Sequence, residues 1–374
     1  MSASKVYFAD MHIGSHDNLL KKLERLIKAA GFESIDFTDR FVAVKMHFGE
    51  PGNLAYLRPQ YAKVVCDYVK RLGGRPFLTD CNTLYVGRRK NALEHLESAY
   101  QNGFNPFQTG VQAIIADGLK GTDDLAVPVE GGEYVKEAKI GRALMDADIV
   151  ISLTHFKGHE MAGFGGALKN LGMGGGSRAG KMEMHNAGKP YVKQDLCVGC
   201  GMCAKECAHG APIVKNGKCT IDESRCVGCG RCIGVCPKDA IATHNDEAND
   251  IMNCKIAEYT KAVVQNRPAF HISLVIDVSP FCDCHSGNDI AIVPDVGMFA
   301  SFDPVALDVA CADAVNAQPP IAGSLLASAA AHENAPCCHD HFAAISPDTN
   351  WKSAIEHGVK IGLGQTEYEL VQVK

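Results

Sequence analysis

The chain has 374 residues, which exceeds the usual size of a single domain and predicts two or more structural units around a large core. Its formal net charge is -6 and charged residues are spread along it, so no basic stripe indicates nucleic acid and no polybasic block indicates a membrane surface. No signal peptide or long apolar run is visible, and we therefore predict a cytoplasmic protein.

The first half of the chain alternates between strand and helix patterns. A strand is predicted over residues 41–48, and apolar residues then recur at helical spacing over 59–73. Further strands are predicted over 76–82 and 147–156, with a helix near 88–101 between them. The last of these strands is almost continuously apolar, as in a strand covered on both faces. This alternation predicts an α/β fold, with a mixed or mostly parallel sheet flanked by helices.

The same pattern returns after a cysteine-rich segment in the middle of the chain. A helix is predicted near residues 250–265, followed by strands over 269–280 and 288–299. Another helix is predicted over 303–316, with Asp303 as its N-cap and proline at its first position. Both halves are therefore predicted to belong to one α/β domain, into which the cysteine-rich segment is inserted.

The chain contains seventeen cysteines, and eight of them form two halves with the spacing CxxCxxCxxxC. An odd number of cysteines in a long chain without an export signal argues against disulfides and favours metal-bound thiols. With this spacing, three thiolates of one half bind one [4Fe-4S] cluster, and the fourth cysteine binds the other cluster. The predicted ligands are Cys197, Cys200, Cys203 and Cys236 for cluster one, and Cys226, Cys229, Cys232 and Cys207 for cluster two.

Two zinc sites are the alternative for these thiols, but four evenly spaced cysteines in each half suit iron-sulfur clusters better than the paired CxxC motifs of a zinc ribbon. The segment resembles the bacterial two-cluster ferredoxin family, although Ala208 stands where that family has proline. Cys219 lies outside the ligand pattern and is expected to be a buried apolar residue. The strand and helix pattern on either side places the insert at residues 187–246, between two parts of the α/β domain at 1–186 and 247–374. The resemblance implies that the insert is a small α+β ferredoxin-like unit.

Polar or thiol side chains follow the predicted ends of several strands, where open α/β sheets build their sites. Each one alone is more often an ordinary loop or edge residue, so the prediction of a site rests on the group as a whole. Its members are Lys45, His47, Asp80, His155, Lys157, Cys282 and Cys284.

Residues 154–185 form an unusually glycine-rich stretch. Glycines leave backbone N–H groups free to bind an anion, and nearby cations add positive charge. A GxxxxGK pattern ends at Lys181, but Met182 follows instead of serine or threonine, so a P-loop nucleotidase is excluded. The cations predicted to bind an anion here are Lys157, Lys169, Arg178 and Lys181.

Histidines and thiols outside the cluster motifs leave alternatives open. His155, His159 and His185 could bind a metal, although hydrogen-bonded histidines are favoured. Cys282 and Cys284 could grip one soft metal, act as a redox pair or stay reduced near the surface. A second group of thiols and histidines at residues 336–341 lies in an alanine-rich region, where a surface loop is favoured.

Five stretches resemble the family known as domain of unknown function 362, in its form described as uncharacterised Fe-S centre proteins. The resemblance covers nearly the whole chain and implies a ferredoxin insert within one α/β domain. It supplies no settled substrate. The stretches are VAVKMHFGEPGN, PFLTDCNTLY, GHEMAGFGGALKNLGMG, FCDCHSGND and SFDPVALD.

From these patterns we predict an iron-sulfur oxidoreductase, in which the insert passes low-potential electrons to a pocket in the α/β domain. Cys282 and Cys284 would react there, His155 or His159 would move protons, and Lys169 would help to hold an anionic group. The alternative is a non-catalytic electron carrier or metal-handling protein, with a further metal ion at the extra thiols. The expected partners are a redox protein, as donor or acceptor, and a small anionic substrate, while the sequence does not set the oligomeric state.

Overall fold

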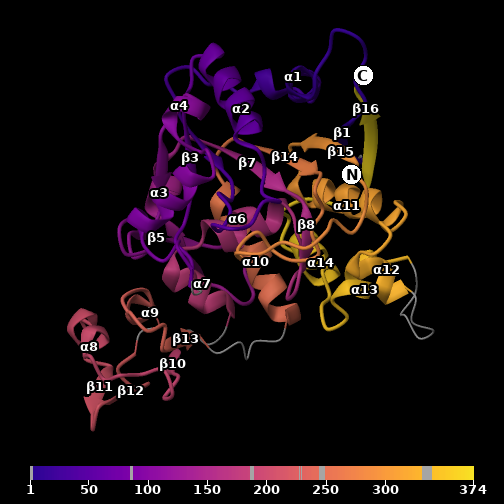
Figure 1. Cartoon of the computed structure of the whole chain (residues 1–374). Coiled ribbons are helices and arrows are strands. Elements are labelled where there is room, and N and C mark those ends of the chain that lie inside the picture. Colours follow the sequence, from indigo (N-terminus) through magenta and orange to yellow (C-terminus); the bar gives the residue numbers. More distant parts are fainter. Residues whose placement is uncertain are drawn as a thin grey trace.

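An eight-stranded mixed sheet lies at the centre of the computed structural model, with the strand order β16-β1-β15-β14-β7-β2-β3-β4 (Figure 1). The structure describes residues 3–84, 87–185, 189–226, 228, 230–243, 249–330 and 339–374. The strands of this sheet are β1 (Ser4–Asp10), β2 (Phe41–Lys45), β3 (Arg75–Asp80), β4 (Ala113–Ile115), β7 (Ile149–His155), β14 (Ala269–Val275), β15 (Gly297–Ser301) and β16 (Tyr368–Gln372).

Most neighbouring strands of the sheet run parallel. β2 pairs in parallel with β3 and β7, β7 with β14, and β3 with β4. β15 runs antiparallel to β14 and β1, and β16 is parallel to β1. The predicted α/β fold with a mixed, mostly parallel sheet is therefore confirmed. Because β2, β3, β7 and β14 run in one direction, their carboxyl ends meet at the same edge, where α/β sheets build their sites.

Helices cover both faces of the sheet, so its strands carry apolar side chains on both sides. In β2, Val42 and Val44 pack into one core with α1 and α2, whereas Ala43 packs into a second core with α6 and α10. None of the helices in the described residues is long and apolar enough to cross a membrane. The helices around the sheet are α1 (Leu19–Ala29), α2 (Pro59–Arg71), α3 (Ala92–Gln101), α4 (Pro106–Thr109), α5 (Arg142–Asp146), α6 (Ala167–Gly175), α7 (Arg178–His185), α10 (Asn249–Val264), α11 (Pro304–Asn316), α12 (Leu325–Ala330), α13 (His341–Ile345) and α14 (Lys352–Lys360), with one 3-10 turn at Phe32–Ser34.

One predicted helix in the second half of the chain is confirmed, and one predicted strand is partly wrong. The helix predicted over 303–316 is confirmed, and the Asp303 side chain accepts hydrogen bonds from the first N–H groups of α11. The strand predicted over 288–299 is wrong in its first part, because residues 288–296 form a loop before β15. Its apolar Ile292 is buried without a sheet, and its N–H donates to the carbonyl of Val278 at 2.8 Å.

Residues 190–243 form a small unit beside the main sheet (Figure 1). Within the described residues, the strands of this unit pair only with one another. The predicted boundaries of the insert, at 186/187 and 246/247, lie outside the described residues, as do residues 336–338 of the second group of thiols. The elements of the unit are β10 (Pro190–Val192), α8 (Met202–Glu206), β11 (Pro212–Lys215), β12 (Lys218–Ile221), α9 (Arg231–Gly234) and β13 (Ile241–Thr243).

Two short hairpins complete the described structure. β5 (Asp124–Pro128) pairs with β6 (Glu137–Gly141), and β8 (Lys157–His159) pairs with β9 (Gly163–Gly165). The second hairpin follows β7 directly and carries His159 at the end of its first strand, so the sequence between β7 and α6 places this imidazole beside the carboxyl edge of the sheet.

Glycine at position 172 allows α6 and α10 to pack closely. A Cβ at Gly172 would overlap the carbonyl oxygen of Ile256, which is backbone and cannot turn away. We expect Gly172→Ala to lower the free energy of unfolding by about 1–3 kcal/mol, although alanine favours a helix by about 1 kcal/mol. Urea denaturation measures this, with Gly14→Ala as the control, because no atom lies within 4 Å of a Cβ at Gly14. Equal stability of the two variants would contradict the proposed close contact.

Candidate functional site

A cavity of about 780 Å³ opens at the carboxyl edge of the parallel strands. The structure brings into its wall all seven residues that sequence analysis placed at strand ends, together with Lys169, Lys181, His159 and His185. Parallel strands explain this convergence, since residues that are far apart in the sequence end their strands at the same edge. The wall also contains Glu50 and Arg89, which sequence analysis did not single out.

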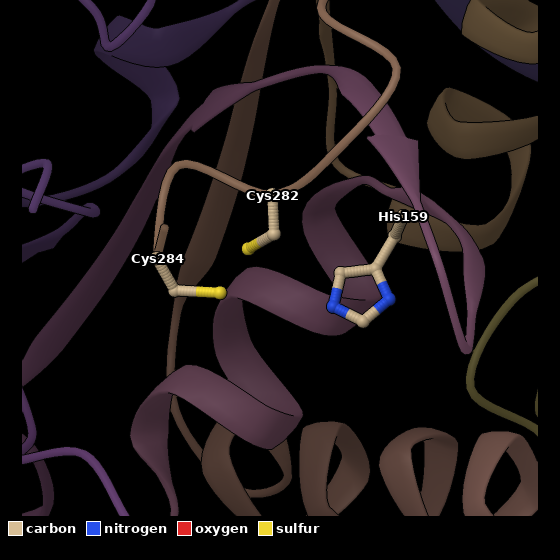
Figure 2. Close-up of side chains that lie close together, drawn as sticks. All are labelled: His159, Cys282 and Cys284. Carbon is tan, nitrogen blue, oxygen red and sulfur yellow. The ribbon is translucent and has the colours of Figure 1, made fainter. Parts of the chain in front are cut away.

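Two thiols, an imidazole and an ammonium group meet inside this cavity. Cys282 and Cys284 lie on the loop after β14, and their sulfurs face each other and the ring of His159 (Figure 2). Both Sγ atoms and a ring nitrogen of His159 lie within 4.8 Å of one another. Nζ of Lys169 is 3.8 Å from Sγ of Cys282. Groups of this kind can activate a thiolate or hold a metal ion.

The two thiols differ in acidity. A hydrogen bond from the Cys284 thiol lowers the pKa of Cys282 well below its ordinary value, and the charge of Lys169 and a hydrogen bond from His159 add to this effect against the cost of burial. Because the Cys284 thiol donates this hydrogen bond, the bond raises the pKa of Cys284, and burial raises that pKa further. This arrangement favours a thiolate at Cys282 and a thiol at Cys284.

Backbone amides fix the orientation of His159. Its Nδ1 accepts hydrogen bonds from the N–H groups of Met161 and Ala162, each at 3.1 Å. The other ring nitrogen, Nε2, faces the two sulfurs (Figure 2). A neutral imidazole that accepts at Nδ1 carries its proton on Nε2, so this ring is arranged to donate a hydrogen bond to sulfur.

His155 and Lys157 bind Asp283, the residue between the two cysteines. Nδ1 of His155 is 2.8 Å from the Asp283 carboxylate, and its Nε2 is 2.8 Å from the carbonyl oxygen of Ile276. Nζ of Lys157 lies 3.5 Å from the same carboxylate. Burial raises the pKa of Asp283, but His155 and Lys157 outweigh burial and hold that pKa well below its ordinary value. Of the two histidines predicted to move protons, His159 faces the thiols, and His155 anchors their loop.

Two buried ion pairs form part of the cavity wall. Lys45 lies 3.0 Å from Asp80, and Arg89 lies 2.7 Å from Glu50, with each pair buried. In the part of the chain that the structure describes, no carboxylate lies within ion-pair distance of Lys169. The same holds for Lys181, whose Nζ donates to the carbonyl of Gly176. Of these two cations, Lys169 is the one whose Nζ lies beside the Cys282 sulfur, where it can meet an anionic ligand.

The first turn of α6 binds a protein carboxylate. Asp308 accepts hydrogen bonds from the N–H groups of Ala167 and Leu168 at 2.6 and 2.9 Å. These amides were expected to be available to an anion, but α11 already supplies their acceptor. Together with the close packing at Gly172, this contact shows that part of the glycine-rich stretch has a structural role, since it holds α6 against α10 and α11.

Helix α7 lies between the cavity and the small unit of residues 190–243 (Figure 1). Lys181 and His185 line the cavity. Arg178 and Met182 pack against Gly230 of that unit, where a Cβ would lie 2.7 Å from Cγ of Arg178 and 3.2 Å from Cγ of Met182. Arg178, predicted for the same anion site as Lys181, is not part of the cavity wall.

The predicted cluster ligands that the structure describes lie around two small cavities in the unit of residues 190–243. Cys229 lies outside the described residues. Four thiols around one cavity are a donor set for a [4Fe-4S] cluster and also for structural zinc. The first cavity is lined by Cys197, Cys200, Cys203 and Cys236, and the second by Cys207, Cys226 and Cys232.

Cys219 is a fifth cysteine at the first of these cavities. Its Sγ lies 3.5 Å from Sγ of Cys203, and its N–H donates to Sγ of Cys197 at 3.3 Å. It is buried, as expected, but it also lies beside the predicted ligands. The spacing of the motif gave no indication of this, because Cys219 reaches the cavity through the β11–β12 hairpin.

The match to a family model covers residues 42–313, most of the chain, under the description domain of unknown function (DUF362). The chain belongs to the DUF362 family. A thylakoid-associated protein of Synechocystis sp. is 27% identical over 127 residues, which are 32% of this chain and 34% of that protein. The match thus spans about a third of the relative's length.

Two solved structures share a distant likeness with the chain. The lactate racemase apoprotein of Thermoanaerobacterium thermosaccharolyticum has a TM-score of 0.41 and 10% identity, covering 99% of this chain and 83% of that one. A Thermotoga maritima protein has a TM-score of 0.36 and 14% identity, covering 75% of this chain and 54% of that one. Likeness at this level does not bear on the activity of the DUF362 protein.

Proposed function

We propose that this DUF362 protein is an iron-sulfur oxidoreductase. The insert would hold two [4Fe-4S] clusters that supply electrons, and the thiols of the main cavity would use them on a bound substrate. The observation that carries the proposal is the sorting of the described cysteines into two separate cavities, since spacing in the sequence assigned the same residues to the same two sets.

Contacts between the insert and the α/β part support a route for electrons between them. Nζ of Lys90 lies 2.7 Å from Asp239, and Nζ of Lys120 lies 2.5 Å from Glu206. Helix α7 contacts Gly230 on one side and lines the cavity on the other. The second cysteine-lined cavity, which includes Gly230, is therefore separated from the main cavity by a single helix.

The residues of the main cavity would then carry out the chemistry. Cys282 would serve as the nucleophilic thiolate, with His159 donating a hydrogen bond to it and Lys169 attracting an anionic ligand. Asp283, held by His155 and Lys157, would keep the loop in place. Burial of Cys282 in the wall limits the access of water to the reacting sulfur.

A metal-handling protein is the second candidate function, and one observation favours it. His159, Cys282 and Cys284 form one group that could hold a metal ion, and Glu160, Cys284 and His285 form another. Thiolates and imidazole suit soft metals such as zinc or copper. In this alternative the insert would pass electrons to partner proteins without a reaction in the main cavity.

Metal and sulfide analysis of anaerobically purified protein tests the proposal. We expect about eight iron and eight acid-labile sulfide per chain, a brown colour and bleaching in air. Stoichiometric zinc without sulfide would contradict it, because the insert would then hold structural zinc. One further equivalent of zinc or copper beside eight iron would favour the metal-handling alternative.

A further inference from the structure

We infer that Cys282 and Cys284 form a reversible redox dithiol that reduces a small disulfide bound in the main cavity. The inference names the substrate class of the proposed oxidoreductase and rests on that proposal for the source of electrons. The exchange itself needs only residues of this cavity.

The positions of the two sulfurs support direct exchange between them. Cys282 and Cys284 are separated by one residue, and their side chains point toward each other (Figure 2). Cys282 lies buried in the cavity wall and Cys284 is more exposed. Asp283 between them is anchored to His155 and Lys157, which holds the loop while bonds form and break at sulfur.

The hydrogen bonds of His159 favour a dithiol over a three-ligand metal site. A metal bound at Nε2 would require the proton to move to Nδ1, which would then face the N–H groups of Met161 and Ala162. Histidines that bind metals usually donate their second N–H to a carboxylate or carbonyl, the reverse of this arrangement. Nε2–H is instead placed to donate to a thiolate.

The exchange balances with the thiols that are present. The Cys282 thiolate attacks one sulfur of the substrate disulfide, whose S–S bond breaks and releases one substrate thiolate. Cys284 gives its proton to that thiolate and attacks the Cys282 sulfur, which releases the second substrate thiolate and forms a Cys282–Cys284 disulfide. The substrate has gained two electrons and one proton. Two electrons, from a dithiol or from two one-electron clusters, and one proton from the solvent then restore the thiolate and the thiol.

The cavity indicates a small substrate with an anionic group. Its volume of about 780 Å³ lies in the range of small-molecule sites. Lys169 lies 3.8 Å from the attacking sulfur and, within the described residues, has no carboxylate partner. A substrate whose carboxylate lies close to its disulfide could therefore form an ion pair with Lys169 while Cys282 attacks the disulfide.

The test uses full-length protein, kept anaerobic, with the anionic probe 5,5'-dithiobis(2-nitrobenzoate) and the neutral probe 4,4'-dipyridyl disulfide. Peptide mass mapping follows Cys282 and Cys284 separately from the other cysteines. In wild type we expect a Cys282–Cys284 disulfide, and in Cys284→Ser a stable mixed disulfide on Cys282. Lys169→Met should slow the reaction with the anionic probe about tenfold and with the neutral probe much less.

Two results would overturn the inference: no Cys282–Cys284 disulfide in wild type, or a Cys282→Ser variant whose Cys284 reacts as fast as wild-type Cys282. Iron and sulfide counts on the same samples separate this inference from the proposed function. A Cys282–Cys284 disulfide in protein without clusters supports the dithiol and contradicts the iron-sulfur proposal. Loaded clusters without that disulfide support the iron-sulfur proposal and contradict the dithiol.

Discussion

Alanine at Cys232 should remove about half of the iron from the protein, whereas alanine at Cys203 should remove distinctly less. Both cysteines are predicted ligands, one at each cavity of the unit of residues 190–243. The first cavity has a further thiol, since Sγ of Cys219 lies 3.5 Å from Sγ of Cys203. Among the described residues that line the second cavity, no such reserve thiol is present. Iron and sulfide analysis, with the EPR spectrum of the reduced protein, measures the difference.

The double variant Cys203→Ala with Cys219→Ala completes this experiment. It should lose about half of the iron, as Cys232→Ala does, because no thiol remains to replace Cys203. Cys66→Ala serves as the control, because Cys66 is a cysteine of α2 that is buried in the core between α1, α2 and the sheet and lines neither cavity. Equal iron loss in the two single variants would show that Cys219 cannot serve as a ligand. Full iron content in all variants would show that the ligand sets are wrong.

The fold was predictable from the sequence wherever local pattern and tertiary environment agree. β2 and β7 are mostly apolar because helices cover both faces of the sheet, and α11 begins at an Asp-Pro pair whose aspartate caps it. Residues 288–296 contain enough apolar residues to suggest a strand, but they form a loop that buries Ile292 and Val293. A buried strand and a partly buried loop both contain short runs of apolar residues, so the apolar pattern alone does not distinguish a strand from a loop.

The members of the site were more predictable than their roles. The parallel sheet brings strand ends together whatever residues they carry, so Lys45, His155 and Cys282 could be grouped from the sequence. The hydrogen-bond partner of each side chain, in contrast, depends on contacts between segments that are distant in the sequence. Asp308 reaches the first turn of α6 from α11, and Asp283 receives His155 from β7. No spacing in the sequence encodes such pairs, and for this reason Asp283 was missed.

Alkylation of Cys282 by iodoacetamide should be nearly independent of pH between 6 and 8 in wild type and should become strongly pH-dependent in Cys284→Ala. The hydrogen bond from the Cys284 thiol lowers the pKa of Cys282, with Lys169 and His159 adding to it, so the thiolate persists as the pH falls. Alanine removes the donor and raises the pKa of Cys282. For an unperturbed thiol with a pKa of about 8.5, the thiolate fraction falls roughly 75-fold between pH 8 and pH 6.

Cys284→Ser is the matched control for this pH profile, because serine keeps a hydroxyl donor in place of the thiol. Its profile should lie between those of wild type and Cys284→Ala, and Lys169→Met should shift in the same direction, since it removes a positive charge 3.8 Å from the sulfur. Lys63→Met, on the exposed face of α2, should leave the profile unchanged. Rates are followed on the peptide that carries Cys282, so other cysteines do not contribute. A steep profile in wild type would mean that Cys282 is an ordinary thiol at neutral pH, and the nucleophile assigned to the cavity would have to be abandoned.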